Sequence, residues 1–184
     1  MHIVIKRRDK KFDIRAAKQE DYEHVRDFYY EVTDGMENSQ FKPGWQKDIY
    51  PTQEFLIDSI KKGELYIGEK DGHYLACMVV NHMYNDGYRK VTWPTKASDG
   101  EILVIHALGV APAFAGQGIA KKMAKSIIEL GKKTHMKVIR LDVLEGNIPA
   151  KKVYERLGFN YIDTIQMYYE DTGLTGYMLY EYVL

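Results

Sequence analysis

Residues 108–120 read Leu-Gly-Val-Ala-Pro-Ala-Phe-Ala-Gly-Gln-Gly-Ile-Ala. They overlap the end of a hydrophobic stretch, residues 102–110, that predicts a strand, and they lead into an amphipathic pattern that predicts a helix over residues 117 to about 132. Gly116, Gly118 and Ala120 are small residues at alternate positions, so backbone N–H groups can point at one spot before the positive end of the helix dipole. This pattern predicts a site for a di-anion such as a pyrophosphate.

Glycine at a strand–helix turn can also serve only to bend the chain. Two named phosphate motifs do not account for this turn. The Walker loop, Gly-x-x-x-x-Gly-Lys-Ser/Thr, has no match in the chain. The dinucleotide fingerprint Gly-x-Gly-x-x-Gly matches Gly116 and Gly118, but its third glycine falls on Lys121. Asp142 lies where a ribose-binding acid would, yet too little sequence follows it to complete a doubly wound nucleotide domain.

The bulk properties predict one domain over residues 1–184, large enough to bury a core. The composition, 45% hydrophobic and 28% charged, is typical of a soluble globular protein. Lys plus Arg equals Asp plus Glu at 26 each, so no basic field favours nucleic acid or an anionic membrane. No apolar run is long enough to span a membrane or to act as a signal peptide. We therefore expect a cytoplasmic protein without nucleic-acid or membrane partners.

Cysteine and histidine usage gives no sign of metal or thiol chemistry. Cys77 is the only cysteine, which excludes an intramolecular disulfide, and its apolar surroundings predict a buried, unreactive thiol. The six histidines are scattered without His-x-x-x-His spacing, and there is no Cys-x-x-Cys pair. No metal site is expected.

The order of predicted elements indicates an α/β fold in which a mixed, mainly antiparallel sheet of about seven strands has helices on both faces. Asp71-Gly72 joins two of the strands as a hairpin. Asn147 is expected to cap a helix that ends at Gly158 in a left-handed cap. Strands are expected over residues 12–16, 64–70, 73–83, 102–110, 138–143, 159–168 and 176–183, and helices over 20–32, 53–62, 117–132 and 147–157.

Several of these residues together resemble the GNAT superfamily of acetyl-CoA-dependent N-acetyltransferases. The motifs are Leu108-x-Val110, Pro112, Gly116-x-Gly118-x-Ala120, Asn147-x-x-Ala150-x-x-x-Tyr154 and Gly158-Phe159, in the family's order and spacing. The strand and helix pattern on either side agrees, so the resemblance covers nearly the whole chain. One position departs from the family pattern: the Arg or Gln that heads Arg/Gln-x-x-Gly-x-Gly/Ala falls on Ala115. A backbone cradle needs no side chain there, so cofactor binding should survive.

The resemblance implies that acetyl-CoA lies in a splay between two parallel strands, here residues 102–110 and 138–143. Peptide groups of the first strand would bind the pantetheine arm, and the turn that follows would bind the pyrophosphate. Asn147 would touch the pantetheine arm and Tyr154 would lie near the thioester sulfur, although a tyrosine on this helix stripe can also be a core residue. The expected cofactor-binding residues are Leu108, Gly109, Val110, Ala115, Gly116, Gln117, Gly118, Ile119, Ala120, Asn147 and Tyr154.

The expected mechanism is direct attack of a neutral amine on the thioester carbonyl, without an acyl-enzyme or a metal ion. Tyr154 is the expected proton donor to the leaving thiolate, and a backbone N–H of residues 108–110 the oxyanion donor. Alternation along the strand predicts that His106 points with Val104 and Leu108, opposite Ala107. With a pKa near its ordinary ~6.5, His106 could then take the ammonium proton. A hydrogen-bonded core histidine is the other interpretation.

The acceptor is expected to be an amine of a small molecule or peptide. Its walls would come from the N-terminal helices, residues 34–52 and the last strands. Five aromatic residues there either line an amine pocket or anchor loops: Trp45, Tyr50, Tyr84, Tyr88 and Trp93. A non-catalytic acyl-CoA-binding or sensory domain on the same fold is the alternative function, and a homodimer is left open. An interaction module without enzymatic activity is hard to reconcile with the phosphate cradle and Tyr154.

Overall fold

In the computed structural model, which describes residues 11–37, 39 and 44–184, the described residues form one seven-stranded sheet. Its strands lie in the order β1-β2-β3-β4-β5-β7-β6, and only β4 and β5 run parallel. The predicted mixed, mainly antiparallel sheet is therefore confirmed. The strands are β1 Asp13–Ala16, β2 Leu65–Lys70, β3 His73–Asn81, β4 Ile102–Val110, β5 Val138–Leu144, β6 Asn160–Tyr169 and β7 Gly173–Val183.

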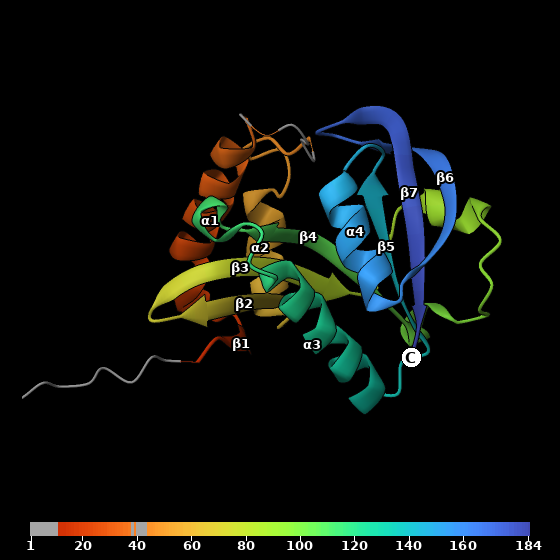
Figure 1. The fold of residues 1–184 in the computed structure, drawn as a ribbon, viewed down its shortest axis with the longest axis horizontal. Coiled ribbons are helices and arrows are strands. Elements are labelled where there is room, and N and C mark those ends of the chain that lie inside the picture. Colours follow the sequence, from red (N-terminus) through yellow and green to blue (C-terminus); the bar gives the residue numbers. More distant parts are fainter. Residues whose placement is uncertain (1–10, 38, 40–43) are drawn as a thin grey trace, which may run out of the picture.

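Helices cover both faces of the sheet (Figure 1). Helices α1 (Tyr22–Met36) and α2 (Gln53–Lys61) lie on one face, and α3 (Ile119–Lys133) and α4 (Ile148–Leu157) on the other. Helix α1 continues to Met36, beyond its predicted end. Helix α3 begins at Ile119 rather than at the predicted residue 117, because Gly118 has φ +76° and cannot be part of a right-handed helix.

Each face of the sheet has its own hydrophobic core. The α3–α4 side buries an apolar cluster that includes Met123, Ile127 and Leu141. The α1–α2 side buries a second cluster around Val25, Leu56, Ile67 and Cys77. Cys77 is completely buried, so the predicted burial of the thiol is confirmed, and burial raises the pKa of the thiol well above its ordinary value.

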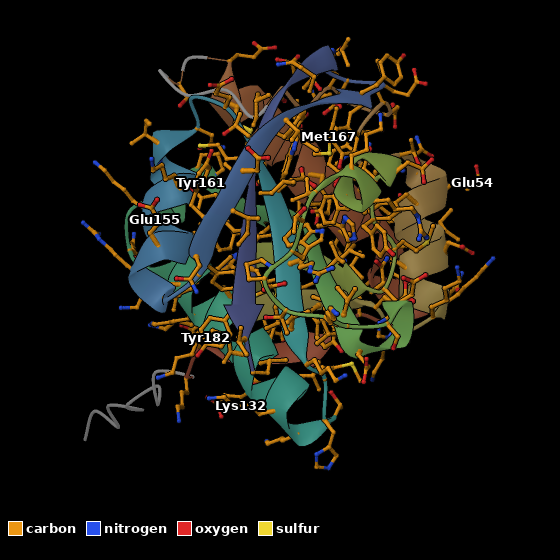
Figure 2. All side chains as sticks on the ribbon, turned by 90° about the vertical axis from the view of Figure 1, so that its right-hand side faces the viewer. Glu54, Lys132, Glu155, Tyr161, Met167 and Tyr182 are labelled. Carbon is orange, nitrogen blue, oxygen red and sulfur yellow. The ribbon has the colours of Figure 1, made fainter. Side chains whose placement is uncertain are left out.

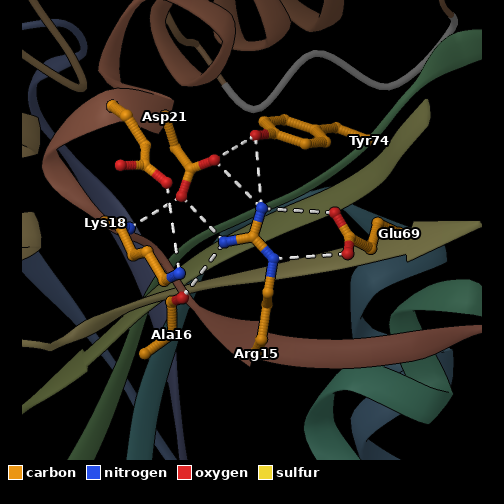
Figure 3. Close-up of polar contacts among 7 residues, drawn as sticks. Arg15, Ala16, Lys18, Asp21, Glu69 and Tyr74 are labelled. Atoms are coloured by element: carbon orange, nitrogen blue, oxygen red, sulfur yellow. Dashed lines mark hydrogen bonds and ion pairs between the residues drawn. The ribbon is translucent and has the colours of Figure 1, made fainter. Parts of the chain in front are cut away.

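The edge strand β1 is held by a network of charged groups (Figure 3). The Arg15 guanidinium donates to both carboxylate oxygens of Asp21, at 2.7 and 2.9 Å, and to Glu69 of β2 at 3.3 Å. The Tyr74 hydroxyl donates to Asp21 from β3. The bonds from Arg15, with those from Tyr74, hold the pKa of Asp21 well below its ordinary value. The network therefore fixes the start of α1 against the sheet.

Residues 82–101, between β3 and β4, cover the sheet face beside α2 (Figure 2). They contain a short 3-10 helix, Asp86–Lys90, that packs against Met167 of β6 (Figure 2). Tyr88 in this segment is only 2% exposed. This largely polar segment therefore places the aromatic side chain of Tyr88 in the interior, next to β5.

A buried ion pair fixes this segment to the sheet. Arg140 of β5 donates through Nε to Glu181 of β7 at 2.9 Å, and both side chains are at most 7% exposed. The guanidinium also donates to the carbonyl of Thr95 at 2.9 Å and lies 4.0 Å from the centre of the Trp93 ring. A buried charge pair needs this kind of extra hydrogen bonding to offset its desolvation. The pair thus anchors the segment that carries Tyr88.

The parallel strands β4 and β5 separate after a short ladder. Three pairs join them, at Ile102–Val138, Leu103–Ile139 and Val104–Arg140. Beyond that point β5 continues to pair with β7, and β4 with β3, while the two parallel strands diverge (Figure 1). Residues 105–110 of β4 therefore have no ladder partner on the β5 side. This is the strand splay that the family resemblance implies.

A β-bulge interrupts the alternation of β4. Ala107 has φ +49°, and the register with β3 shifts between Cys77 and Val79. Because a bulge adds one residue to the strand, side chains after it switch face. Leu108 packs into the α3–α4 core, whereas His106 and Ala107 both face the α1–α2 side. The prediction that His106 shares a face with Leu108, opposite Ala107, is therefore wrong.

Candidate active site

An open turn precedes helix α3. Gly116 and Gly118 both have φ +76°, and a Cβ added to either would meet no other atom within 4 Å. The first bond into the helix runs from Lys122 N to Gly118 O at 3.1 Å, and no side chain caps the helix. In the described chain, the N–H groups of residues 119–121 thus have no acceptor. Free N–H groups beside open space at a helix N-terminus fit a pyrophosphate.

Helix α4 begins with the predicted cap and carries Tyr154 toward the splay. Asn147 accepts a hydrogen bond from Ala150 N at 3.2 Å, and Gly158 ends the helix with φ +96°. The Tyr154 ring is 7% exposed and packs edge-to-face on Phe159, with ring centres 5.4 Å apart. It is thus part of the core, as the alternative interpretation holds.

The hydroxyl group of Tyr154 nevertheless remains available. Among the described residues it has no hydrogen-bond partner, although every fully buried polar side-chain atom of those residues has one. The hydroxyl is therefore the part of this side chain that can still donate to a bound molecule. Burial, and then the nearby charge of Asp142, raise the pKa of Tyr154, so the phenol stays protonated at neutral pH and can act as a donor.

Asp142 lies on β5 just beyond the last parallel pair with β4. Its Oδ2 accepts hydrogen bonds from the hydroxyls of Tyr88 at 2.8 Å and Tyr169 at 2.9 Å. Its Oδ1 has no hydrogen-bond partner among the described residues, and the residue as a whole is partly exposed. Desolvation raises the pKa of this carboxyl, which the two phenols lower in part and the charge of Asp171 raises further. Asp142 is thus a fixed carboxylate with one free oxygen and increased basicity.

His106 lies on β4 at the same level as Asp142, two residues beyond the paired Val104 and Arg140. Its Nε2 is 2.9 Å from Asn81 Oδ1 and 3.0 Å from the carbonyl oxygen of Met83. Both partners are acceptors, which assigns the proton to Nε2 and leaves Nδ1 unprotonated. Desolvation lowers the pKa of His106 to about 4, so the expectation of an ordinary pKa is wrong. The imidazole is neutral at physiological pH.

The predicted aromatic residues divide between the two roles considered. Tyr88 donates a hydrogen bond to Asp142, and burial followed by the charge of Asp142 raises the pKa of Tyr50, so these two lie at the site. Trp45 packs between Tyr29 and Tyr50. The other two anchor the 82–101 segment: the Tyr84 hydroxyl donates to Asp99, and Trp93 Nε1 donates to the carbonyl of Tyr88.

The turn between β6 and β7 meets the loop before α2 over the site. Gln46 Nε2 donates to the carbonyl of Asp171 at 2.8 Å, and a Cβ on Gly44 would touch the Thr172 side chain. These two segments are the walls expected for an acceptor, although residues 38 and 40–43 of the expected wall lie outside the described residues. Tyr169, which completes the Asp142 site, had no signal in the sequence beyond its place near the end of a strand.

The described residues contain no group of three or more His, Cys, Asp or Glu side chains arranged to hold a metal ion. Among the same residues, no helix is both long enough and apolar enough to cross a membrane.

Comparison with known proteins gives one consistent family. The family model described as "Acetyltransferase (GNAT) family" matches residues 22–159. A Bacillus subtilis protein, provisionally assigned as a [ribosomal protein bS18]-alanine N-acetyltransferase, is 26% identical over 160 residues, which cover 87% of this chain and 88% of the relative.

Solved structures with this fold include an acetyltransferase of the GNAT family from Streptococcus agalactiae. It has a TM-score of 0.79 at 19% identity, covering 96% of this chain and 98% of that chain. Another is a Salmonella typhimurium protein, provisionally assigned as an acetyltransferase and described with its cofactor acetyl-CoA. Its TM-score is 0.68 at 13% identity, with 95% of this chain and 94% of that chain covered.

Proposed function

The chain belongs to the GNAT acetyltransferase family, and we propose that it transfers the acetyl group of acetyl-CoA directly to an amine of a small molecule or peptide. We further propose that residues 1–184 make up one acetyltransferase domain. The observation that carries the proposal is the splay between β4 and β5, next to which the Oδ1 of Asp142 and the hydroxyl of Tyr154 have no hydrogen-bond partner among the described residues. The acetyl-CoA in the Salmonella structure and the alanine of a ribosomal protein in the name of the Bacillus relative support the donor and the kind of acceptor.

The residues proposed to hold acetyl-CoA are those expected from the sequence. The unpaired β4 edge at residues 108–110 offers peptide groups to the pantetheine arm, and residues 115–120 offer backbone N–H groups to the pyrophosphate. The Asn147 side chain uses its oxygen to cap α4, which leaves its amide N–H groups for the pantetheine arm. When bound, acetyl-CoA supplies the thioester carbonyl that the amine attacks.

In the proposed reaction, a C–N bond forms to the acetyl carbon and the C–S bond breaks. Asp142 Oδ1 accepts a proton from the attacking amine, and the Tyr154 hydroxyl donates a hydrogen bond or a proton to the departing sulfur. A backbone N–H of residues 108–110 stabilises the oxyanion that develops on the carbonyl. An ammonium and acetyl-CoA thus give an amide, CoA thiol and one proton released to solvent. This assignment gives Asp142 the proton-accepting role expected for His106.

Acetyl-CoA turnover, followed as release of free thiol, tests the function. We expect release that depends on an added amine, across a panel of alkyl amines, polyamines, amino acids and peptide N-termini. The non-catalytic alternative predicts CoA binding with no thiol release for any of them. The free carboxylate oxygen of Asp142 at the splay argues for the catalytic function.

Replacing Gly118 by valine is expected to lower the affinity for CoA by about 10-fold or more. The side chain would occupy the open space of the turn, and at φ +76° it would distort the N–H groups of α3. Titration of the folded variant with CoA in a calorimeter measures the loss.

Gly63→Val is the matched control, because Gly63 also has φ +70° and open space around it but lies at the end of α2. It carries the same kind of backbone strain without touching the turn. Equal CoA affinity in the Gly118→Val and Gly63→Val proteins would contradict the assignment of the turn.

Replacing His106 by glutamine is expected to leave unchanged the rise of kcat/KM with pH on the acid side of the profile, which we call the acid limb. With a pKa of about 4, His106 is neutral throughout the physiological range, and glutamine can keep the donor to Asn81 and Met83. The pH profile of the variant with an accepted amine provides the measurement. Disappearance of that limb would return the proton-accepting role to His106.

A further inference from the structure

Two carboxyl groups lie on the acceptor side of the site without a cationic partner. Neither Asp142 nor Asp171 takes part in any ion pair among the described residues. Asp171 is half-buried in the turn between β6 and β7, and desolvation raises the pKa of its carboxyl, which hydrogen bonds from the backbone N–H groups of Asp171 and Thr172 lower in part. Each group therefore bears part of the cost of removing a carboxylate from water, and a bound cation would offset it.

Tyrosines connect these two carboxyl groups. Burial raises the pKa of Tyr50 and of Tyr177, and the charges of Asp142 and Asp171 raise both further, so both phenols lie within the field of both acids. The Tyr169 hydroxyl donates to Asp142, and its ring packs edge-to-face on Tyr177 with centres 4.9 Å apart. Aromatic faces attract ammonium groups and leave their hydrocarbon linkers in apolar contact. The wall between the acids thus suits an alkyl chain with a charge at each end.

The site is also covered on its outer side. Gln46 holds the backbone of Asp171, and Gly44 lies against Thr172, so the loop before α2 closes on the β6–β7 turn. The Thr172 hydroxyl is in turn 2.7 Å from the Tyr177 hydroxyl. These two segments therefore border the acceptor side of the site next to Asp171.

We propose that the acceptor is a short alkyl diamine, whose reacting ammonium meets Asp142 and whose second ammonium meets Asp171. The inference rests on the proposed acetyl transfer, because it assigns the two ends of the acceptor within that same site. One charge of the acceptor is then next to the proton acceptor, and the other fixes the length and direction of the chain. An acceptor with a single charge would leave Asp171 without a cationic partner.

The test compares acceptors of equal length that differ in the second charge: 1,4-diaminobutane, 1-aminobutane and 4-amino-1-butanol. We expect kcat/KM to be about 10- to 100-fold higher for the diamine, the size of effect that a charge-assisted hydrogen bond supplies. Asp171→Asn should remove most of that preference, with a much larger loss for the diamine than for 1-aminobutane. Glu170→Gln is the matched control, because Glu170 precedes Asp171 but is exposed, and the preference should persist in it.

Binding of the same three amines to the complex of the enzyme with CoA is measured in parallel by calorimetry, so that slow transfer does not hide recognition. Equal kcat/KM and equal binding for the diamine and 1-aminobutane would overturn the inference while leaving acetyl transfer intact. An alanine peptide with a neutral second residue that reacts as well as the diamine would also overturn it. Failure of the proposed function would instead appear as no CoA binding and no thiol release with any amine, which overturns both.

Discussion

Asp142→Asn is expected to lower kcat/KM for acetyl transfer by about 10²- to 10⁴-fold, the usual contribution of a positioned proton acceptor. Asparagine keeps an oxygen that can accept the bonds from Tyr88 and Tyr169, so the packing of the site should be retained. It loses the free carboxylate oxygen that would take the proton. Steady-state kinetics with a saturating amine, together with the CoA dissociation constant, measure the effect, and CoA affinity should stay unchanged.

The pH profile separates this role from a structural one. A carboxyl group accepts a proton only above its pKa, so kcat/KM should rise with pH through the pKa of Asp142. That pKa is raised by desolvation, so the acid limb lies above the range of an ordinary aspartate, near ~3.9. Asp142→Asn should abolish the limb, whereas Asp163→Asn, which removes an exposed charge from β6, should keep it. A limb that persists in Asp142→Asn would disprove the assignment.

The fold was predictable because its signals are local. The hydrophobic run of residues 102–110, the Asp71-Gly72 hairpin and the Asn147 cap each depend on neighbours in sequence, and each appears in the structure where it was expected. The cradle of Gly116 and Gly118 is local in the same sense. Its glycines need left-handed backbone whatever the rest of the chain does.

The orientation of His106 was not predictable in this way. Simple alternation assumes a regular strand, but Ala107 adopts φ +49° and forms a bulge. Alanine gives no sign of this conformation in the sequence, since glycine or asparagine is the usual residue there. The conformation depends on tertiary contacts, including the Tyr29 hydroxyl, which donates to the carbonyl of Ala107 at 2.8 Å.

The role proposed for Asp142 could not be predicted from the sequence, for a related reason. In the sequence it is one acid in a hydrophobic strand, and its only suggested role was that of a ribose ligand. The site arises from three separate segments, because Tyr88 reaches it from the 82–101 segment and Tyr169 from the end of β6. The Tyr88 contribution depends in turn on the buried pair of Arg140 and Glu181, which holds that segment to the sheet. The spacing of residues in the sequence does not indicate that segments far apart in the chain contact each other in this way.

Tyr154→Phe is expected to reduce kcat by about 10²- to 10⁴-fold, as for loss of a positioned proton donor. The ring of Tyr154 would keep its edge-to-face contact with Phe159, so the fold of α4 should be unaffected. Only the hydroxyl would be lost, and among the described residues that hydroxyl has no partner that its removal could leave unsatisfied. Single-turnover kinetics measure the chemical step directly, and thermal unfolding should show a midpoint close to that of the unmodified protein.

The matched control for this variant is Tyr182→Phe. Tyr182 packs on the same Phe159 ring, with centres 5.2 Å apart, but it lies on β7. If Tyr154 acted only through packing, the two substitutions would have similarly small effects on kcat, and the hydroxyl would have no part in the reaction.

If the Tyr154 hydroxyl assists the departing thiolate, the loss in Tyr154→Phe should be smaller for an acyl donor whose thiol is more acidic, because a better leaving group needs less help from a proton donor. If the loss of activity were the same for both acyl donors, Tyr154 would not act on the departing sulfur.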